Sequence, residues 1–330
     1  MPFAHIIGTG SAVPERVLTN QDLEQIVDTT DEWIVRRSGI KERRIARQDK
    51  NETTTELGLS AARRAMQTAG VTADQIDGII AATVTGDRLF PSTACMIQKE
   101  LGADNAAAYD ISAGCSGFVY GLEQANNGIR MGVSRTVLVV GTERLSSVLN
   151  WEDRSTCVLL GDGAGAVLLH GSDEPGGILS THIKSDGRLW DLLYAEAGNN
   201  PPPAMLESLA FLPHHLKMEG NRLFKQAVPS MVKIAEQAIE HNKLSREDIQ
   251  LMVPHQANVR ILQAVAERLQ IPMEKVYTNL HKYGNTSSAS IPIALDEAYQ
   301  EGRIKKGDYV LVVAFGAGLT WGASIIQWSL

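Results

Sequence analysis

The chain lacks several features that mark common classes of protein. Its 330 residues include three cysteines, Cys95, Cys115 and Cys157, without CxxC spacing or paired histidines, so the sequence encodes neither a disulfide framework nor a metal site. Its longest apolar runs, such as TVLVVG (136–141) and YVLVVAFGAG (309–318), are too short to span a bilayer. The N-terminus has no basic region followed by a long apolar stretch. We therefore expect a cytoplasmic protein with reduced thiols and without membrane insertion.

Short catalytic and nucleotide-binding signatures are also missing. No HExxH, GxSxG or phosphate-loop motif occurs, and in GTGSAVPE (8–15) Pro14 interrupts the helix that a dinucleotide fingerprint requires. The formal net charge of −7 argues against general nucleic-acid binding, although a local basic patch can still recruit an acidic partner. What remains is a globular protein, 44% hydrophobic, whose length suggests two domains or one duplicated unit.

An internal repeat supports the duplicated unit. The segment VTADQIDGIIAATV (71–84) matches LSREDIQLMVPHQA (244–257), and TVLVVG from Thr136 matches YVLVVA from Tyr309, both at an offset of 173 residues. An amphipathic helical pattern precedes the first match in each half. The two halves are therefore interpreted as copies of one α/β unit.

The alternation of strand-like and helical segments predicts the architecture. Apolar, β-branched runs alternate with helices, which favours mostly parallel sheets covered by helices, one sheet in each half. We expect two stacked halves of layered αβα type. The segment 186–222 has no match in the first half, and a long loop in a compact fold is often a binding element.

Cys115 is the first candidate for chemistry. AAAYDI (106–111) suits a strand and GFVYGLEQANNGI (117–129) suits a helix, so the thiol falls at the N-terminus of that helix. The helix dipole and free amides there favour a thiolate and predict a lowered pKa. A buried cysteine that acts as a small hydrophobe is the alternative, and the local sequence leaves both interpretations open.

His255 and Asn285 are the other candidates. His255 directly follows an apolar strand in LMVPHQANVRI (251–261), at the carboxyl end where open α/β sheets place ligands, although a lone histidine more often caps or packs. Asn285 lies in LHKYGNTSSASIPIALDEA (280–298), the segment that takes the place of the Cys115 turn in the second half. A turn residue is the alternative for Asn285. Stacking of the halves would bring its loop to face Cys115.

A basic cluster, RRSGIKERRIAR (36–47), follows Trp33. Such a run is usually a solvated face, but an aromatic ring beside arginines can also hold an adenine and its phosphates.

With these residues located, the chain resembles the thiolase-fold condensing enzymes, and specifically the β-ketoacyl-acyl-carrier-protein synthase III family. The resemblance runs through the whole chain. Its motifs, in order, are GTGSAVPERVLTN, DEWIVRRSGIKERR, FPSTAC, DISAGCSGF, GDGAGA, VPHQAN, GNTSSASIP and FGAGLTWG. It implies a thiolase-like α/β fold of five layers, built from two pseudo-symmetric αβα halves: residues 1–173 with the nucleophilic cysteine, and residues 174–330 with the histidine and asparagine.

The resemblance also implies an activity. The family initiates type II fatty acid synthesis by joining an acyl-CoA primer, here expected to be acetyl-CoA, to malonyl carried on acyl carrier protein. Cys115 would hold the acyl group, while His255 and Asn285 would stabilise the enolate that decarboxylation forms. The backbone amides of Cys115 and Ala317 would form the oxyanion hole. No cofactor is implied, because the CoA thioester is a substrate.

Binding residues follow from the same motifs. The resemblance implies CoA-binding residues Trp33, Arg37, Arg154, Asn221 and Asn258, acyl-pocket residues Phe90 and Leu160, and carrier-protein contacts Lys225 and Arg260. Phe90 would reach across a homodimer into the partner's pocket, and Leu160, where some relatives have phenylalanine, leaves primer length and branching open.

Other functions are weighed against this one. A related condensing enzyme of secondary metabolism or long-chain acyl condensation would share the same three residues, and a non-catalytic carrier-protein-binding relative would lack reactivity at Cys115. A degradative thiolase needs a second, late cysteine, which is absent after Cys157. A hydroxymethylglutaryl-CoA synthase needs a catalytic acid, and the sequence shows no convincing glutamate near the site.

Overall fold

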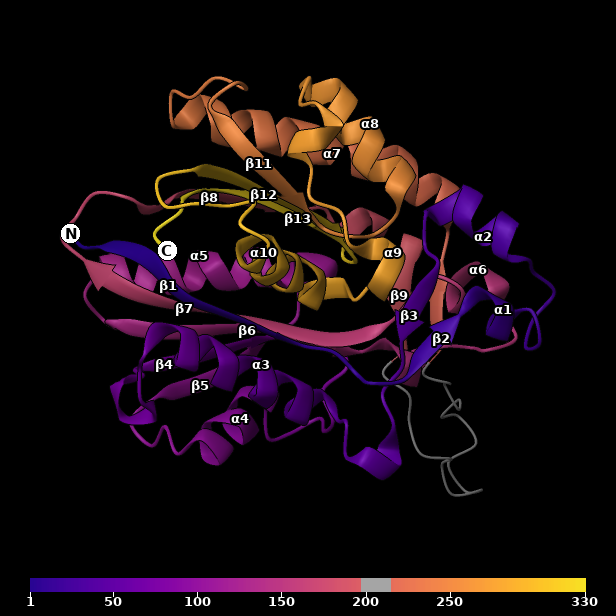
Figure 1. Ribbon diagram of the computed structural model, residues 1–330, viewed down its shortest axis with the longest axis horizontal. Helices are drawn as coiled ribbons and strands as arrows, with labels where there is room; N and C mark the ends of the chain where they lie inside the picture. Colours follow the sequence, from indigo (N-terminus) through magenta and orange to yellow (C-terminus); the bar gives the residue numbers. More distant parts are fainter. Residues whose placement is uncertain (197–214) are drawn as a thin grey trace.

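Two β-sheets form the frame of the molecule, which the computed structural model describes over residues 1–196 and 215–330 (Figure 1). The first sheet has the strand order β1-β7-β6-β4-β5 and the second has the order β11-β12-β13-β8. The strands of the first sheet are β1 (Phe3–Ala12), β4 (Gly78–Ala82), β5 (Ala107–Ile111), β6 (Thr136–Arg144) and β7 (Asp162–Ser172). Those of the second are β8 (Gly177–Ser185), β11 (Ile249–Pro254), β12 (Tyr309–Gly316) and β13 (Thr320–Gln327).

Helices cover both sheets in three layers (Figure 1). The outer face of the first sheet carries α3 (Thr54–Ala69) and α4 (Thr93–Leu101), and that of the second carries α7 (Gly220–His241) and α8 (Val259–Leu269). Between the sheets lie α5 (Gly117–Arg130) and α10 (Ser290–Gln300). Buried apolar side chains of both sheets and both inner helices form one continuous core, which includes Phe118, Leu122 and Leu295. This α-β-α-β-α stacking confirms the predicted five-layered α/β fold.

Local sequence explains where these helices begin. Thr53 caps α3 by accepting a hydrogen bond from the Glu56 amide, and Gly70 ends that helix in the left-handed conformation. The inner helices α5 and α10 have no side-chain cap. Each instead continues a 3₁₀ turn, η3 (Gly114–Ser116) or η8 (Ser287–Ala289). The starts of the two inner helices are therefore turns that lie at the centre of the molecule.

The topology of the two sheets repeats, as the offset of 173 residues predicts. Strand β6 runs parallel to β4 and antiparallel to β7, and β12 runs parallel to β11 and antiparallel to β13. The prediction of mostly parallel sheets is wrong. Among the described strands of these sheets, the parallel pairs are β4–β5, β4–β6 and β11–β12, and the other four pairs are antiparallel. The short connection 317–319 between β12 and β13 permits only an antiparallel return.

Smaller elements surround one end of the layered core. They are β2 (Val17–Thr19), α1 (Asn20–Leu23), α2 (Asp31–Ser38), β3 (Glu42–Arg44), α6 (Arg154–Cys157) and α9 (Leu280–Tyr283). In the segment 186–222, β9 (Leu193–Ala195) pairs antiparallel with β10 (Leu216–Met218); residues 197–214, which include Pro201 to Pro203, lie outside the described residues. No helix in the described ranges has the length and apolar composition that a bilayer crossing needs.

Candidate active site

The turn that carries Cys115 lies where the two halves meet. β5 ends at Ile111, η3 holds the cysteine, and α5 begins at Gly117. The Ser116 hydroxyl donates to the Thr320 carbonyl at 3.0 Å, and the Thr320 hydroxyl donates to the Ala113 carbonyl at 2.7 Å. These bonds tie the turn of the first half to the start of β13 in the second.

Two glycines allow the backbones to approach this closely. Gly114 has φ +52°, and a Cβ there would lie 2.7 Å from the Ala317 nitrogen. A Cβ at Gly316 would collide with the Cys115 amide nitrogen and lie 3.0 Å from Cys115 Cα. Neither position tolerates a side chain without moving backbone. The backbone segments that carry the Cys115 and Ala317 amides are therefore in close contact.

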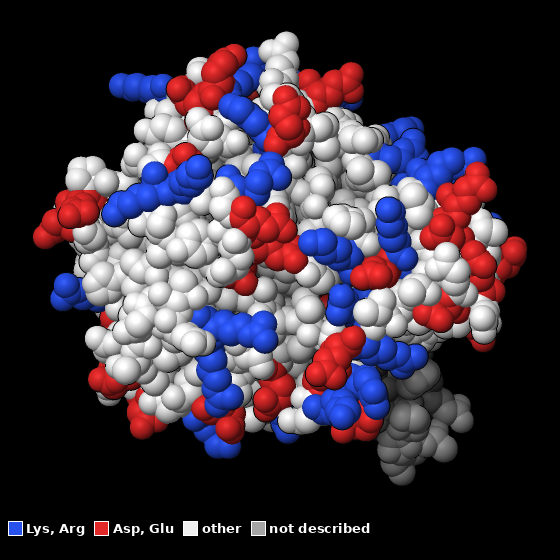
Figure 2. Space-filling view, viewed as in Figure 1, with Lys and Arg blue, Asp and Glu red and all other residues white. Residues whose placement is uncertain are grey.

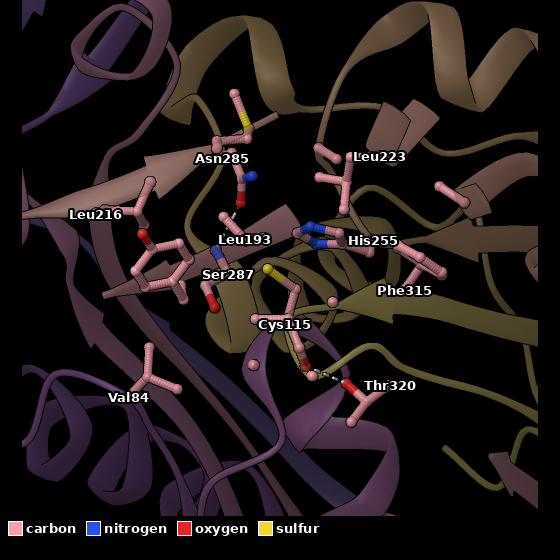
Figure 3. Close-up of a pocket in the computed structure, with 18 of the residues that line it drawn as sticks. Val84, Cys115, Leu193, Leu216, Leu223, His255, Asn285, Ser287, Phe315 and Thr320 are labelled. Atoms are coloured by element: carbon pink, nitrogen blue, oxygen red, sulfur yellow. Dashed lines mark hydrogen bonds between the residues drawn. The ribbon is translucent and has the colours of Figure 1, made fainter. Parts of the chain in front are cut away.

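A cavity of about 560 Å³ opens at this turn. Cys115, His255, Asn285 and Ala317 all line it, so the structure brings together the four residues that the sequence analysis places at the reaction centre. In Figure 3 the sulfur of Cys115 points into the space between His255, Asn285 and Ser287. The thiol comes from the first half of the chain, and the other three residues come from the second half.

His255 is buried in its neutral form. It follows β11 and is 3% exposed, and burial lowers its pKa to about 3. Its Nδ1 lies 2.7 Å from Ser290 Oγ, which also accepts the Gln256 amide at 3.3 Å. Ser290 Oγ has one proton to donate, and when it donates that proton to Nδ1, the imidazole proton lies on Nε2. In that tautomer His255 presents a hydrogen-bond donor to the cavity.

Hydrogen bonds also fix the orientation of the Asn285 side chain. Its Oδ1 accepts the Ser287 amide at 2.8 Å, so its Nδ2 is the atom free to donate into the cavity. Its backbone is fixed as well, because its amide donates to the Leu159 carbonyl at 2.8 Å and its carbonyl accepts the Gly161 amide at 3.0 Å. His255 and Asn285 thus supply two neutral donors beside the thiol.

The predicted lowering of the Cys115 pKa is wrong for this structure. Burial raises the pKa of the thiol to about 11, and the nearby Glu143 carboxylate acts in the same direction. Hydrogen bonds from Ser287 and from the backbone amide of Cys115 oppose this only in part. The N-terminus of the helix does favour the thiolate, but only by about 1 kcal/mol. This does not offset the cost of burying the negative charge without a neighbouring cation.

Glu143 is the residue that the sequence analysis missed when it found no convincing glutamate near the site. It is the penultimate residue of β6, is fully buried, and accepts a hydrogen bond from Ser288 Oγ at 2.8 Å. Its position in TVLVVGTER, two residues after the apolar run TVLVVG, was a usable signal, because the carboxyl ends of parallel strands in such sheets gather functional groups. Glu143 therefore belongs to the surroundings of Cys115.

The residues expected to hold CoA form a cluster outside the cavity. The guanidinium carbon of Arg154 lies 5.3 Å from the centre of the Trp33 ring, and that of Arg37 lies 5.8 Å from it. A ring stacked on both sides needs about 7 Å between its neighbours. Arg154, whose Nη1 donates to the Asp28 carbonyl at 2.5 Å, must therefore move before an adenine can enter between it and Trp33.

Asn258 lies at the cavity and Asn221 lies next to a residue that lines it. Asn258 lines the cavity, but its Oδ1 accepts the Arg260 amide at 2.9 Å and its Nδ2 donates to the Arg37 carbonyl at 3.1 Å. In this structure it caps α8 and joins that helix to α2. Asn221 is exposed and follows Gly220, which lines the cavity at the start of α7.

The two residues predicted to form an acyl pocket are placed differently. Leu160 lines the cavity, and its neighbours there include further apolar side chains: Val84, Leu145, Val148, Leu193 and Leu216. Phe90 does not line it and is 83% exposed. The described parts of β9 and β10 line the cavity, in agreement with a binding role for the segment 186–222.

Lys225 and Arg260 lie next to residues that line the cavity. Both are exposed, and each is adjacent in sequence to a lining residue, Phe224 or Ile261. They lie on α7 and α8, which pack against each other. Figure 2 shows Lys and Arg side chains gathered at the upper right, where α2 and the start of α7 lie. A basic rim on an acidic protein can bind an acidic partner.

Among the described residues, no cluster of His, Cys, Asp and Glu side chains has the geometry of a metal site.

The chain is similar in sequence and fold to known synthase III proteins. Two family models match: 3-oxoacyl-[acyl-carrier-protein (ACP)] synthase III over residues 109–187 and its C-terminal model over residues 239–328. A β-ketoacyl-[acyl-carrier-protein] synthase III of Caldanaerobacter subterraneus subsp. tengcongensis is 52% identical over 326 residues, which cover 99% of this chain and 98% of the relative. The chain belongs to the β-ketoacyl-acyl-carrier-protein synthase III family.

Solved structures of synthase III enzymes agree with this assignment. The crystal structure from Aquifex aeolicus VF5 superposes with a TM-score of 0.91 at 48% identity and covers 98% of this chain and 100% of that one. The structure from Thermus thermophilus gives 0.92 at 45% identity, with 98% and 99% covered. This member of the family is thus a condensing acyltransferase of fatty acid synthesis with a thiolase-like fold.

Proposed function

We propose that this enzyme starts fatty acid synthesis by joining acetyl-CoA to malonyl-acyl carrier protein through an acyl-Cys115 intermediate. The observation that carries the proposal is the cavity in which one thiol faces two neutral side-chain donors and two adjacent backbone amides. The proposed products are a β-ketoacyl carrier protein, CO₂ and free CoA. No cofactor enters the reaction, and the proposed compartment is the cytoplasm.

Loading of the primer uses the Cys115 turn. The sulfur attacks the thioester carbonyl of acetyl-CoA, and the carbonyl oxygen gains negative charge that the amides of Cys115 and Ala317 stabilise. The C–S bond to CoA then breaks, and CoA leaves as a thiolate that takes a proton from solvent. Thiol and thioester exchange similar leaving groups, so the acyl group stays activated on Cys115.

Condensation uses the donors of the second half. Malonyl-acyl carrier protein loses CO₂, and its thioester oxygen becomes an enolate that accepts hydrogen bonds from His255 Nε2 and Asn285 Nδ2. Neutral donors suit this step, because decarboxylation releases the carbanion without a base. The enolate carbon then attacks the acyl-Cys115 carbonyl, and the C–S bond to Cys115 breaks.

Substrate binding is proposed for the outer residues. Trp33, Arg37 and Arg154 would hold the adenine and phosphates of CoA, and Asn221 and Asn258 would bond the pantetheine arm. For Asn258 this requires exchange of its present bonds to Arg37 and Arg260. Outside that path, Lys225 and Arg260 would dock the acidic carrier protein at the mouth of the cavity.

A homodimer is proposed from the surface around Phe90. Strand β5 is the edge of the first sheet and pairs only with β4 among the described strands. Near it, Leu89 is 90% exposed, Phe90 is 83% exposed and Tyr109 is 44% exposed. An unpaired edge with exposed large apolar side chains favours association. Because Phe90 does not reach the cavity of its own chain, it would close the cavity of the partner.

The test is a reconstituted reaction with acetyl-CoA and either malonyl-acyl carrier protein or malonyl-CoA, with products measured by mass spectrometry. The expected result is acetoacetyl carrier protein, with far less product from malonyl-CoA. Product from malonyl-CoA alone would instead indicate a condensing enzyme of a specialised pathway. No product with either acceptor, in folded protein, would indicate a non-catalytic relative.

A further inference from the structure

Arg43 is a buried arginine within the basic run RRSGIKERRIAR (36–47), a kind of sequence that usually forms a solvated face. It lies on β3 and is 0% exposed, whereas its neighbours Glu42 and Arg44 are partly exposed. None of the ion pairs among the described residues includes it. Burial lowers its pKa to about 10, so the guanidinium stays charged at neutral pH. A buried charge without an opposite charge beside it is costly, so its hydrogen bonds must compensate.

The hydrogen bonds of Arg43 join two segments that are far apart in the sequence. Its Nη1 donates to the Leu18 carbonyl at 3.1 Å and to Asn20 Oδ1 at 2.9 Å. Its Nη2 donates to the Val158 carbonyl at 2.6 Å. Because the guanidinium is planar and rigid, the positions of these acceptors are fixed relative to one another. Arg43 therefore ties the segment after α6 to β2 and α1.

The segment that Arg43 holds is the one that fixes the backbone of Asn285. The Asn285 amide donates to the Leu159 carbonyl at 2.8 Å, and its carbonyl accepts the Gly161 amide at 3.0 Å. Leu160 and Asn285 thus form an isolated parallel bridge. The Val158 carbonyl, to which Arg43 donates, belongs to the residue just before this pair of bonds. A movement of Val158 is therefore passed along one short stretch of backbone to Asn285.

Close packing leaves no slack between these segments. A Cβ at Gly161 would lie 3.1 Å from Arg43 Cβ and would collide with the Tyr283 carbonyl. A Cβ at Gly284 would lie 3.2 Å from Arg43 Cβ and 2.8 Å from the Leu159 carbonyl. The stem of Arg43 therefore lies against both strands of the bridge that holds Asn285. Figure 1 shows β3 beside α9, the helix that leads to this bridge, and the two elements pack against each other.

The other end of the arrangement is anchored at α2. Asn20 is 0% exposed, and its Nδ2 donates to Asp31 Oδ1 at 2.8 Å and to the Ile40 carbonyl at 2.9 Å. Asp31 is the first residue of α2. Since Asn20 Oδ1 is the acceptor for Arg43 Nη1, the guanidinium is held against a fixed partner. Arg43 can therefore act as a rigid support for the segment 158–161.

We propose that Arg43 is a positioning residue for the condensation step, which supports the segment 158–161 and through it places the Asn285 donor at the enolate oxygen. Primer loading does not depend on this support. It uses the turn of Cys115 and the connection 317–319, which are tied together by the bonds of Ser116 and Thr320 and not through the segment 158–161. The inference rests on the proposed function, in which Asn285 acts on the malonyl group and not on the primer.

The test compares the two half-reactions in Arg43→Met. Loading is followed as acetylation of Cys115 by acetyl-CoA, and condensation as a single turnover of enzyme already acetylated, mixed with saturating malonyl-acyl carrier protein. Condensation should slow at least about tenfold, because a displacement of about 1 Å at a catalytic group can cost about 100-fold. Loading should change by less than about twofold, because the oxyanion-hole amides keep their places. The carrier-protein concentration for half-maximal rate should also change by less than about twofold.

A double variant shows whether Arg43 acts through Asn285. In Asn285→Ala there is no side-chain donor left to position, so adding Arg43→Met should slow condensation by less than about twofold further. Arg63→Met is the matched control, because Arg63 is an exposed arginine on the outer helix α3 that donates to the Glu100 carbonyl at 3.2 Å. It should keep both native rates. If Arg43→Met fails to fold, Arg43→Lys keeps the charge, but one ammonium cannot replace both Nη groups, and condensation alone should slow about threefold or more.

Three outcomes would overturn the proposal. Equal slowing of loading and condensation in the Arg43 variants would show general support of the fold. Native condensation rates in these variants would show that the segment 158–161 needs no support from Arg43. A full additional loss in the Asn285→Ala background would show that Arg43 acts independently of Asn285. Failure of the proposed function is distinguishable from all three, because the native enzyme, once acetylated, would then form no product with malonyl-acyl carrier protein.

Discussion

At the scale of single residues, the three central side chains of the site are uncharged at neutral pH. His255 and Asn285 are neutral, and each has one polar atom occupied by a protein partner and one free to donate. The thiol is protonated at neutral pH, because enclosure raises its pKa. Decarboxylation needs donors at the enolate oxygen, whereas loading needs a place for the thiol proton.

The pKa of His255 predicts a pH dependence of stability. Its folded pKa of about 3 lies below the unfolded value of about 6.5, so the unfolded state binds a proton that the folded state does not. The contribution of neutral His255 to stability is therefore complete above pH 6.5 and is lost as the pH falls toward 3. Between pH 7.5 and 5.5 the free energy of unfolding should fall by about 1.4 kcal/mol more in the native enzyme than in His255→Asn. Denaturant unfolding at the two pH values measures this, and parallel changes in both proteins would contradict it.

At the scale of elements, the inner helices α5 and α10 bring the reactive groups together. The position of Cys115 before a helix and of His255 after a strand could be predicted from apolar periodicity, and the facing loop of Asn285 from the repeat. The raised pKa of Cys115 and the burial of Glu143 could not, because both depend on side chains from distant segments. The antiparallel returns of β7 and β13 were missed because β-branched runs do not reveal strand direction.

Contact between the Cys115 turn and the end of β12 gives a prediction for Gly316. Gly316→Ala would place a methyl group on the Cys115 amide, so the backbone must shift and the oxyanion hole must open. We expect a loss of at least about 100-fold in the rate of primer loading, the magnitude typical of a missing oxyanion donor. Gly187→Ala is the matched control, because a Cβ there meets nothing within 4 Å. Equal loading rates in the two variants would show that the close approach is not required.

Asn258 gives a second prediction at this scale. Asn258→Ala removes the cap of α8 and the bond from that helix to the end of α2. We expect about 1 kcal/mol lower stability, as for other lost helix caps. The KM for acetyl-CoA should rise with little change in kcat, because Trp33 and Arg37 on α2 lose their support. Steady-state kinetics separates the two constants, and a fall in kcat alone would place Asn258 in the chemistry instead.

At the scale of the whole molecule, the five layers put the reaction centre between two copies of one unit. One half provides the thiol and its carboxyl neighbour, and the other provides the donors and most of the cavity wall. Duplication gave two equivalent turns at the inner helices, which now carry different residues. A site made in this way is intact only while the halves stay packed, so loss of packing between them should abolish every step together.

Association into dimers is the prediction for the intact molecule. Light scattering should give twice the 35.8 kDa of one chain, and Phe90→Asp should lower the dimer fraction by placing charge on the exposed surface beside β5. Primer loading should weaken in parallel, because the partner's cavity loses its closing side chain. A monomeric native enzyme with full activity would contradict this arrangement.

The central claim is that Cys115 carries the acyl group, and intact-protein mass spectrometry tests it most directly. The enzyme is exposed briefly to acetyl-CoA and, in separate samples, to longer acyl-CoAs, beside Cys115→Ser under the same conditions. The account predicts a mass gain of one acyl group in the native enzyme and none in the variant, with the extent of loading ranking the primers. An unmodified native enzyme, or an equal gain in Cys115→Ser, would contradict it.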